Sequence, residues 1–312
     1  MALMLSKRCR ASPYDVVLAG EYYYDLIFSG LGEIPKLGAD VWSKNFDAVP
    51  GASYTTARAF SLLGVKVGWW CETGTDLFSQ LMIAAATRDD IDASLFQRRA
   101  EARIRLSAAF SMAHDRGFIS HFQGDETLPS KAEIERLGPR VLIVQGLTCR
   151  SDLADLFAFA RSIGIFCCLD CQHVDEDMAD GNLAEILRRT DCFICNETEA
   201  KRLTNSESHD AALLAFAEYC PTTVIKRGAY GASALHAGHV IEIGAPQVEV
   251  VDTTGAGDSF NAGFIYGLLQ GWQMEKALRA AVACGSASVT AHGGKALPRE
   301  SELLQSMAEA TW

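Results

Sequence analysis

The sequence contains no run of apolar residues long enough to cross a bilayer, so we expect neither a spanning helix nor a membrane partner. Lys7, Arg8 and Arg10 lie near the start, but the apolar stretch that follows the basic residues of a secretory signal is missing. We therefore expect a cytoplasmic protein whose residues 1–12 form a frayed leader before the first strand.

Positive charge is scarce as well. The 28 Lys and Arg residues are outnumbered by 39 Asp and Glu residues, which gives a net charge of −11. A nucleic-acid duplex would require a basic face, so we expect no nucleic-acid partner. A small anionic substrate is still compatible with this charge, because local basic residues bind phosphate even in an acidic protein.

The sequence also lacks a Gly-x-Gly-x-x-Gly turn after its first strand, which argues against a dinucleotide-dependent dehydrogenase. It shows no internal repeat, low-complexity segment or linker. Of its 312 residues, 49% are hydrophobic and 21% are charged, a composition typical of a globular protein with a large core. We interpret residues 1–312 as a single domain.

The ten cysteines include two close pairs, Cys168 with Cys171 and Cys192 with Cys195. This spacing outlines a four-cysteine zinc site. Both pairs, however, lie in or beside apolar runs typical of buried parallel strands. Residues three apart on a strand point to opposite faces, so a pair on one strand would need a turn to bind one ion. We favour buried free thiols.

Apolar strands alternate with helical segments from about residue 141 onward. This alternation predicts a parallel sheet with helices on both faces. The first strand is predicted at Tyr14–Ala19, closed by Gly20. Ligands of such sheets bind at the carboxyl ends of the strands, so we expect the functional residues there.

Two segments, at about 33–50 and 103–123, do not follow this alternation. Their apolar residues are spread among polar ones, which predicts short, partly exposed strands. We expect these two segments to form a small lid. Arg103 and Arg105 lie on the second segment; we favour solvent over substrate as their surroundings, because arginine is usually exposed.

Residues 252–260 read Asp-Thr-Thr-Gly-Ala-Gly-Asp-Ser-Phe, between a strand-like segment and an amphipathic helix. Glycines allow a tight turn, and the backbone N–H groups of Gly255, Ala256 and Gly257 at a helix N-terminus would bind an anion. Asp258 beside them could accept a proton from a hydroxyl, which together suits phosphoryl transfer. The alternative is that Asp258 is only a first-turn acid favoured by the helix dipole.

This nine-residue segment resembles the C-terminal signature of the ribokinase-like (PfkB) carbohydrate kinases. The resemblance implies a three-layer α/β/α sandwich with a mostly parallel central sheet and a small β-sheet lid. It also implies that Asp258 is the base, that Gly255, Ala256 and Gly257 form an anion hole, and that the enzyme uses ATP and Mg²⁺.

Other segments, spread over nearly the whole chain, resemble the same family. The resemblance assigns substrate binding to four residues: Asp25, Gly51, Ala52 and Thr55. It assigns nucleotide binding to five: Asn196, Lys226, Gly228, Gly231 and Thr253. Glu199 would bind Mg²⁺ through water. A monovalent cation such as K⁺, which many members need, would bind to carbonyl groups of Asp252, Thr254, Ser288, Ala291 and Gly293.

Several of these residues have simpler interpretations. Asn196 and Glu199 could form a helix cap with a first-turn acid, although we favour the magnesium role because the metal prefers hard oxygen ligands. Gly228 and Gly231 could only shape a turn. Asp170 also ends a strand, and a solvated loop acid is as good an interpretation as a site residue.

The chain departs from the family pattern around the substrate. Pro50 and Thr55 replace a glycine and an asparagine of the N-terminal signature, and Tyr23 stands where ribokinases have an asparagine. Aromatic residues could instead stack on the substrate ring. We therefore expect an ATP-dependent sugar kinase and keep two alternatives, a nucleoside kinase and a non-catalytic sugar- or nucleotide-binding homologue. Exposed lid strands would allow a homodimer.

Overall fold

The computed structural model describes residues 12–111, 116–146, 149–172, 177–179 and 181–310. Its central sheet has the strand order β14-β13-β12-β11-β10-β9-β1-β4. The strands are β1 (Val16–Ala19), β4 (Val67–Trp70), β9 (Val141–Gln145), β10 (Phe166–Asp170), β11 (Cys192–Asn196), β12 (Thr222–Lys226), β13 (Ala232–His236) and β14 (His239–Ile243). The neighbouring strands β4, β1, β9, β10, β11 and β12 pair in parallel. Strand β13 pairs antiparallel with β12 on one side and with β14 on the other.

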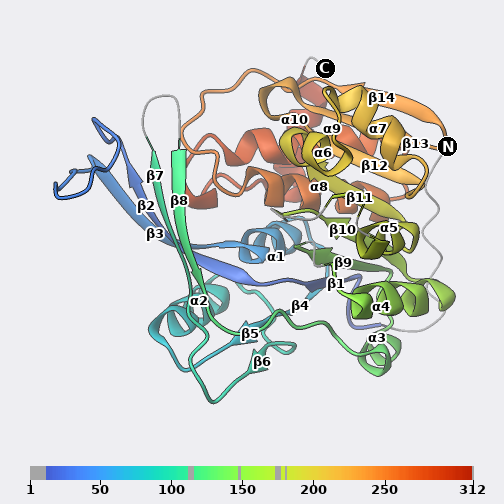
Figure 1. Cartoon of the computed structure of the whole chain (residues 1–312), viewed down its shortest axis with the longest axis horizontal. Coiled ribbons are helices and arrows are strands. Elements are labelled where there is room, and N and C mark those ends of the chain that lie inside the picture. Colours follow the sequence, from blue (N-terminus) through green and yellow to red (C-terminus); the bar gives the residue numbers. More distant parts are fainter. Residues whose placement is uncertain (1–11, 112–115, 147–148, 173–176, 180, 311–312) are drawn as a thin grey trace.

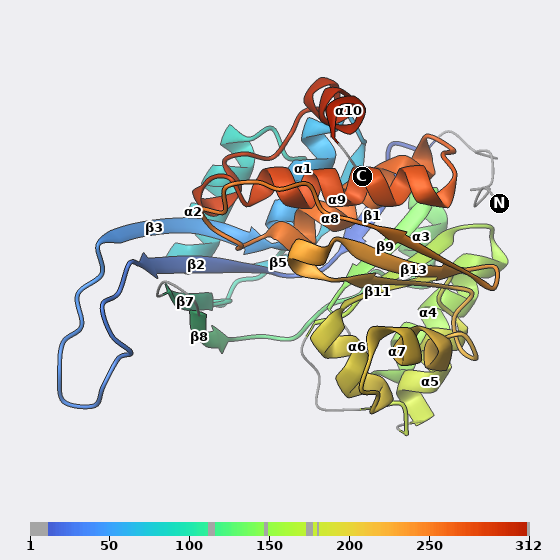
Figure 2. The ribbon, with the colours of Figure 1, turned by 90° about the horizontal axis from the view of Figure 1, so that it is seen from above.

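Helices cover both faces of this sheet (Figure 2). One layer contains α1 (Ser53–Leu62), α8 (Ala256–Leu269) and α9 (Met274–Ser288), and the other contains α3 (Lys131–Leu137), α4 (Ser151–Ser162), α5 (Gly181–Arg188), α6 (Glu197–Thr204) and α7 (His209–Phe216). Alternate residues of β1 feed the two cores: Val16 and Leu18 pack in the first, Val17 and Ala19 in the second. The predicted three-layer sandwich is confirmed.

A separate small sheet projects from the sandwich (Figure 1). Its order is β3-β2-β7-β8, with β2 at Tyr22–Ser29, β3 at Asn45–Ala52, β7 at Arg105–Ser111 and β8 at Arg116–Phe122. Beside it lie the strand pair β5 (Glu72–Thr73) and β6 (Gln97–Arg98) and helix α2 (Leu77–Arg88), while α10 (Glu300–Glu309) ends the described chain.

The bounds of this small sheet differ from the predicted lid segments. Strands β7 and β8 lie within 103–123, but residues 33–44 contain no strand, and the partner of β3 is β2. Only two residues separate β1 from β2, and β2 has apolar residues on both of its faces. It therefore lacks the simple alternation that would identify a partly exposed strand.

A buried group of charges joins the small sheet to the sandwich, and Arg105 is at its centre. The Arg105 side chain is 0% exposed, and its Nη1 atom lies 2.8 Å from the Glu72 carbonyl oxygen and 3.3 Å from Glu21 Oε2. Its guanidinium carbon lies 4.9 Å from the centre of the Phe122 ring. Arg103 is also largely buried, with 18% exposure, and bonds Glu72. The expectation that both arginines face solvent is wrong, because two buried carboxylates hold them.

Replacement of Arg105 by methionine should destabilise the protein. The substitution keeps side-chain length but leaves Glu21 buried without its cation, which typically costs about 3 kcal/mol or more of unfolding free energy. Urea denaturation should show this loss. The matched control is Arg99→Met, because Arg99 also bonds Glu72 but is 42% exposed; it should cost under about 1 kcal/mol. Equal effects of the two substitutions would contradict the central position of Arg105.

Candidate active site

Asp258 lies in the first turn of α8, where strand β9 approaches the helix. Gln145, the last residue of β9, donates from Nε2 to Asp258 Oδ1 at 2.5 Å. Thr56 Oγ1 in turn donates to Gln145 Oε1 at 2.8 Å, which fixes the orientation of the amide. Burial and the nearby carboxylate of Asp170 raise the pKa of Asp258 to about 7, against the opposing effects of Lys226 and Gln145. This carboxyl therefore changes its protonation state near neutral pH.

Asp25 extends from β2 toward the same region and is buried. Burial is the main cause that raises its pKa to about 7, and the charges of Asp258 and Asp252 add to the effect. Gly51 on the paired strand β3 makes room for this carboxylate, because a Cβ atom at that position would lie 2.2 Å from Asp25 Oδ2. The structure thus brings two predicted substrate residues, Asp25 and Gly51, into contact near Asp258.

The N-terminus of α8 has the form expected of an anion site. Gly255 is the N-cap with φ of 77°, in the left-handed region that favours glycine, and it presents the backbone of Ala256 and Gly257. Thr55 packs against this turn, since a Cβ atom on Gly255 would lie 3.0 Å from Thr55 Cγ2. Ala52, the N-cap of α1, has φ of 54°, a conformation that costs a non-glycine residue energy and is common at functional sites.

Lys226, the last residue of β12, reaches the same anion site. Its Nζ donates to Asp170 Oδ1 at 2.7 Å and lies 3.4 Å from Asn261 Oδ1. A Cβ atom on Gly257 would be 3.3 Å from this Nζ, so the ammonium group flanks the helix N-terminus. Burial would lower the pKa of Lys226, but the carboxylate of Asp170 outweighs it and raises that pKa. The lysine is therefore charged at neutral pH.

Asn196 and Glu199 form a reciprocal cap at the start of α6. Asn196 Oδ1 accepts from the Glu199 backbone N–H, and Glu199 Oε2 accepts from the Asn196 backbone N–H, both at 2.8 Å. The geometry thus agrees with the simpler interpretation, in which the two residues form a helix cap. Burial raises the pKa of Glu199, while the nearby charge of Lys226 lowers it. The cap lies beside the Lys226–Asp170 pair, and this position is also compatible with the predicted magnesium role of Glu199.

Gly228 and Gly231 shape the turn after β12. Their φ angles are 55° and 88°, and a Cβ atom on Gly231 would lie 1.9 Å from the carbonyl oxygen of Ile243. The backbone N–H of Arg227 donates to the Gly231 carbonyl at 2.8 Å and closes the turn. Gly231 is therefore required by the backbone, whereas Gly228 adopts a left-handed conformation that favours glycine but has open space where a side chain would lie.

Asp252 ties the loop before α8 to the C-terminal tail. Its Oδ1 accepts from the backbone N–H of Thr254 at 2.9 Å, and its Oδ2 accepts from that of Gly293 at 3.0 Å. Thr253 follows Asp252 directly, and its carbonyl accepts from the Ala256 N–H at 3.3 Å. The structure thus places together the two segments that contain the predicted cation ligands. The remaining members both precede Gly293: Ser288 is the last residue of α9, and Ala291 lies just before the 3₁₀ turn His292–Gly294.

Four residues of this region were not among the predicted site residues: Thr56, Gln145, Asp170 and Asn261. Gln145 and Asp170 both end parallel strands, so the rule that sites form at these ends could have selected them. Asn261 and Thr56 lie inside helices and leave no comparable signal. Their positions depend on how α1 and α8 pack across the sheet.

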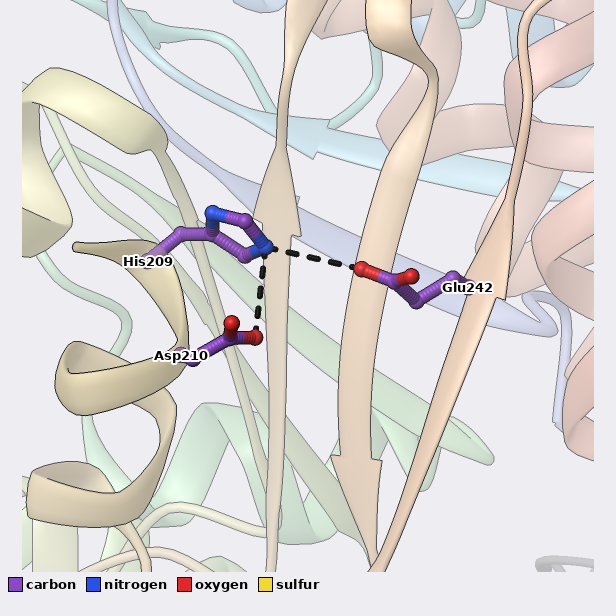
Figure 3. A group of neighbouring side chains, drawn as sticks. All are labelled: His209, Asp210 and Glu242. Carbon is purple, nitrogen blue, oxygen red and sulfur yellow. Dashed lines mark ion pairs between the residues drawn. The ribbon is translucent and has the colours of Figure 1, made fainter.

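A second group of possible metal ligands lies elsewhere, on α7 and β14 (Figure 3). His209 Nε2 lies 3.3 Å from Asp210 Oδ1 and 3.5 Å from Glu242 Oε1. Glu242 Oε1 already accepts from Arg227 Nη1 at 2.8 Å and from Ser233 Oγ at 3.0 Å. A metal would have to compete with this arginine, so we describe the group as an ion-pair cluster.

The cysteine pairs are free thiols, as favoured from the sequence. Cys168 on β10 lies opposite Cys192 on the neighbouring strand β11, and all four cysteines of the two close pairs are buried. Burial raises the pKa of the Cys171, Cys192 and Cys195 thiols, which opposes the thiolate form that zinc requires. Among the described residues, the four cysteines do not form a ligand group.

Comparison with known proteins identifies the family. The family model described as "pfkB family carbohydrate kinase" matches residues 46–301. The chain belongs to this family. It is therefore a phosphotransferase with an alcohol group as acceptor, a kinase of sugars or nucleosides. Among the helices that the structure describes, none has the length and apolar character to traverse a bilayer.

Relatives and solved structures agree with this assignment. The chain is 27% identical over 290 residues to "Ribokinase" of Haemophilus influenzae, covering 88% of this chain and 92% of the relative. It is 42% identical over 90 residues to "Aminoimidazole riboside kinase" of Salmonella typhimurium, covering 27% and 28% of the two chains. A structure of Arabidopsis thaliana ribokinase complexed with ribose and ATP superposes with a TM-score of 0.79 at 22% identity, covering 94% and 98%. This last similarity concerns the fold.

Asp258→Asn should stabilise this kinase at neutral pH. The native carboxyl keeps its proton up to about pH 7, whereas in the unfolded chain its pKa is 3.8. Between these values the native state binds more protons, so stability falls as pH rises, and the penalty is complete above pH 7. Asparagine removes the penalty, and denaturation at pH 7.5 should show a gain of about 1 kcal/mol or more.

The gain should shrink toward pH 4, where the carboxyl is protonated in both states. Asp210→Asn is the control, because Asp210 is an exposed acid on α7. A loss of stability on Asp258→Asn over the whole pH range would show that the buried charge is not a cost.

Proposed function

We propose that the protein transfers the γ-phosphoryl group of ATP to a hydroxyl of a sugar, with Asp258 as the base. The observation that carries this proposal is the position of Asp258 in the first turn of α8, beside the turn at Gly255 and opposite the buried Asp25. A base, an anion site and a hydroxyl-binding acid thus converge at one end of the sheet. Phosphoryl transfer requires positioning and charge stabilisation, and this arrangement supplies both.

The residues divide the reaction between them. Asp25 and the backbone of Gly51 and Ala52 hold the acceptor sugar, and Thr55 supports the anion site from α1. Asp258 takes the proton of the attacking hydroxyl, and Gln145 keeps its carboxylate oriented through the 2.5 Å hydrogen bond. The backbone N–H groups of residues 255–257 stabilise the negative charge on the transferred group.

The nucleotide would lie along the strand ends from β11 to β12. Lys226 supplies a positive charge near the anion site, since its Nζ flanks Gly257. Asn196 and the turn at Gly228 and Gly231 border the same edge. Thr253 lies where the chain enters the anion site. These positions support the nucleotide-binding role of all five residues.

The donor groups present also fit the proposed ions. Glu199 offers a half-buried carboxylate beside Lys226 and Asp170, which suits Mg²⁺ held through water. When bound, the magnesium ion neutralises charge on the phosphate oxygens. For K⁺, the Asp252 carboxylate aligns the backbone of Thr254 and Gly293, so that carbonyl groups of the two segments can face one ion.

A nucleoside acceptor is the second candidate. The local similarity to an aminoimidazole riboside kinase, at 42% identity over 90 residues, favours it. The intact constellation of Asp258, Gln145 and the α8 N-terminus counts against the third hypothesis, a non-catalytic homologue, because a binding protein has no use for a base oriented in this way.

We also propose a cytoplasmic homodimer that forms through the small sheet, which would serve as the lid. Strand β8 is an edge of this sheet and carries Ile119, which is 71% exposed. Trp42, in the loop before β3, is 85% exposed. Exposed apolar side chains and a free strand edge support pairing with a second copy.

Asp258→Asn should bind ATP as the unchanged protein does but lose nearly all turnover, by a factor of about 10³ or more, because the general base is removed. Product formation with a panel of sugars and nucleosides, read with coupled ATP consumption, measures this loss. Asp210→Asn is the matched control and should retain full activity. Retention of more than a few per cent of activity by Asp258→Asn would rule out its role as base.

The activity should also depend on pH through Asp258. The base acts when ionised, and its pKa is about 7, so kcat/KM should fall about tenfold per pH unit below pH 7. Asp170 contributes to the raised pKa. Asp170→Asn should therefore move this acid limb to lower pH. A limb that stays in place, or moves to higher pH, would show that Asp170 does not act on the base.

A further inference from the structure

The turn after β12 contains two of the predicted nucleotide residues, Gly228 and Gly231, on a backbone that glycine leaves free to move. Both have φ angles in the left-handed region. A Cβ atom on Gly228 would have open space around it among the residues that the structure covers. Glycine loses more conformational freedom on ordering than any other residue, so a glycine turn binds a ligand well only where neighbouring groups hold it in the bound shape.

Arg227 stands at the start of this turn and contacts both of its ends through the backbone. Its N–H donates to the Gly231 carbonyl at 2.8 Å, and its own carbonyl accepts from the Tyr230 N–H at 3.0 Å. Arg227 also follows Lys226 directly, and the Lys226 ammonium group flanks the anion site. A shift of Arg227 would therefore move the whole turn relative to that site.

The Arg227 side chain ties the turn to the hairpin of β13 and β14. Its Nη1 atom donates to Glu242 Oε1 at 2.8 Å and to Ser233 Oγ at 3.0 Å. Ser233 Oγ donates to the same Glu242 oxygen at 3.0 Å, which closes a ring of three hydrogen bonds. Ser233 is buried and lies directly opposite Glu242 in the hairpin, so the sheet fixes both partners of the arginine.

The end of β14 holds the turn at a second point. A Cβ atom on Gly231 would lie 1.9 Å from the carbonyl oxygen of Ile243, the residue after Glu242, so the backbones of turn and strand are in close contact. From the other side, His209 of α7 places its Nε2 atom 3.5 Å from Glu242 Oε1 (Figure 3). The ion-pair cluster is thus continuous with the turn through Arg227.

These contacts contribute position more than stability. The side chains of Arg227 and Glu242 are 20% and 56% exposed, and ion pairs at such exposure add little to the free energy of unfolding. We propose that Arg227 is a positioning residue for the nucleotide, which fixes the turn at residues 228–231 in the shape that receives ATP. The inference rests on the proposed function, because it adds a residue to the proposed nucleotide site. Arg227 acts through the turn and does not touch the reacting atoms.

Arg227→Met tests this role, because methionine fills similar space but donates no hydrogen bond. Calorimetry with ATP and Mg²⁺ should give a Kd about fivefold higher than that of the unchanged protein, since the turn must then be ordered on binding. The KM for ATP should rise by a similar factor while kcat stays unchanged, because Asp258 and the anion site belong to another segment. Arg227→Lys should keep the Kd within about twofold, as an ammonium group can donate to both acceptors.

Glu242→Met distinguishes a positioning role from direct contact between the arginine and a phosphate group. If Arg227 acts through the turn, Glu242→Met should weaken ATP binding as Arg227→Met does, and the double variant should be no weaker than either single one. A free arginine that contacts phosphate predicts the opposite, so unchanged or tighter ATP binding by Glu242→Met overturns the inference. Arg189→Met is the control, because Arg189 also pairs with a glutamate but lies on the surface near α5.

Urea denaturation separates positioning from a general structural role. The unfolding free energy of Arg227→Met should stay close to that of the control, in agreement with the exposure of the pair. A large loss of stability accompanied by a loss of kcat would show that Arg227 supports the fold as a whole, and it would overturn the inference. A Kd for ATP equal to that of Arg189→Met would overturn it as well.

The same measurements distinguish failure of the two proposals. ATP binding by the unchanged protein without any product refutes phosphoryl transfer, while the comparison of Kd values among the variants still decides the role of Arg227. Product formation with an ATP affinity that does not respond to Arg227→Met or Glu242→Met refutes the inference alone and leaves the kinase function standing.

Discussion

The active-site end of this structure depends on one buried ion pair, between Lys226 and Asp170. Asp25, Asp170 and Asp258 bring three carboxylates to neighbouring positions, and burial together with the charges of neighbouring carboxylates raises the pKa of Asp25 and of Asp258. Lys226 lies at 2.7 Å from Asp170 and also lowers the pKa of Asp258. Because β10 and β12 are held by the sheet, the pair stays next to the α8 N-terminus. Without this ion pair, it would be harder to hold the ionised Asp258 side chain next to the anion site at the α8 N-terminus.

A second buried charge group, around Arg105, connects the small sheet to the sandwich. Glu21 follows β1, Glu72 starts β5, and Arg105 starts β7, so three segments meet at one guanidinium. The same Glu21 faces a recess beside Gln145. The same side chain therefore both helps to attach the small sheet and lines this recess at the ends of β1 and β9. A buried charged network of this kind contributes geometry more than stability.

Much of the fold and the reaction could be predicted from the sequence, because their signals are local. The alternation of apolar strands and helices predicts the sandwich, and the glycine-rich turn before Asp258 predicts an anion site at a helix start. Strand β2 was missed, since both of its faces pack against other residues and its alternation is lost. Arg105 was expected in solvent because exposure is usual for arginine, and its acidic partners are 33 and 84 residues away in the chain.

The sequence by itself determined the family and the reaction class, and at the strand ends it selected Asn196 and Lys226 but not Gln145 and Asp170. Only the tertiary structure decided the partners of these residues: Gln145 on Asp258, Asp170 on Lys226, and Glu21 in the recess. The physical reason is that a motif such as residues 252–260 defines its backbone locally. Charge balance and pKa, in contrast, depend on groups that burial brings together from distant segments.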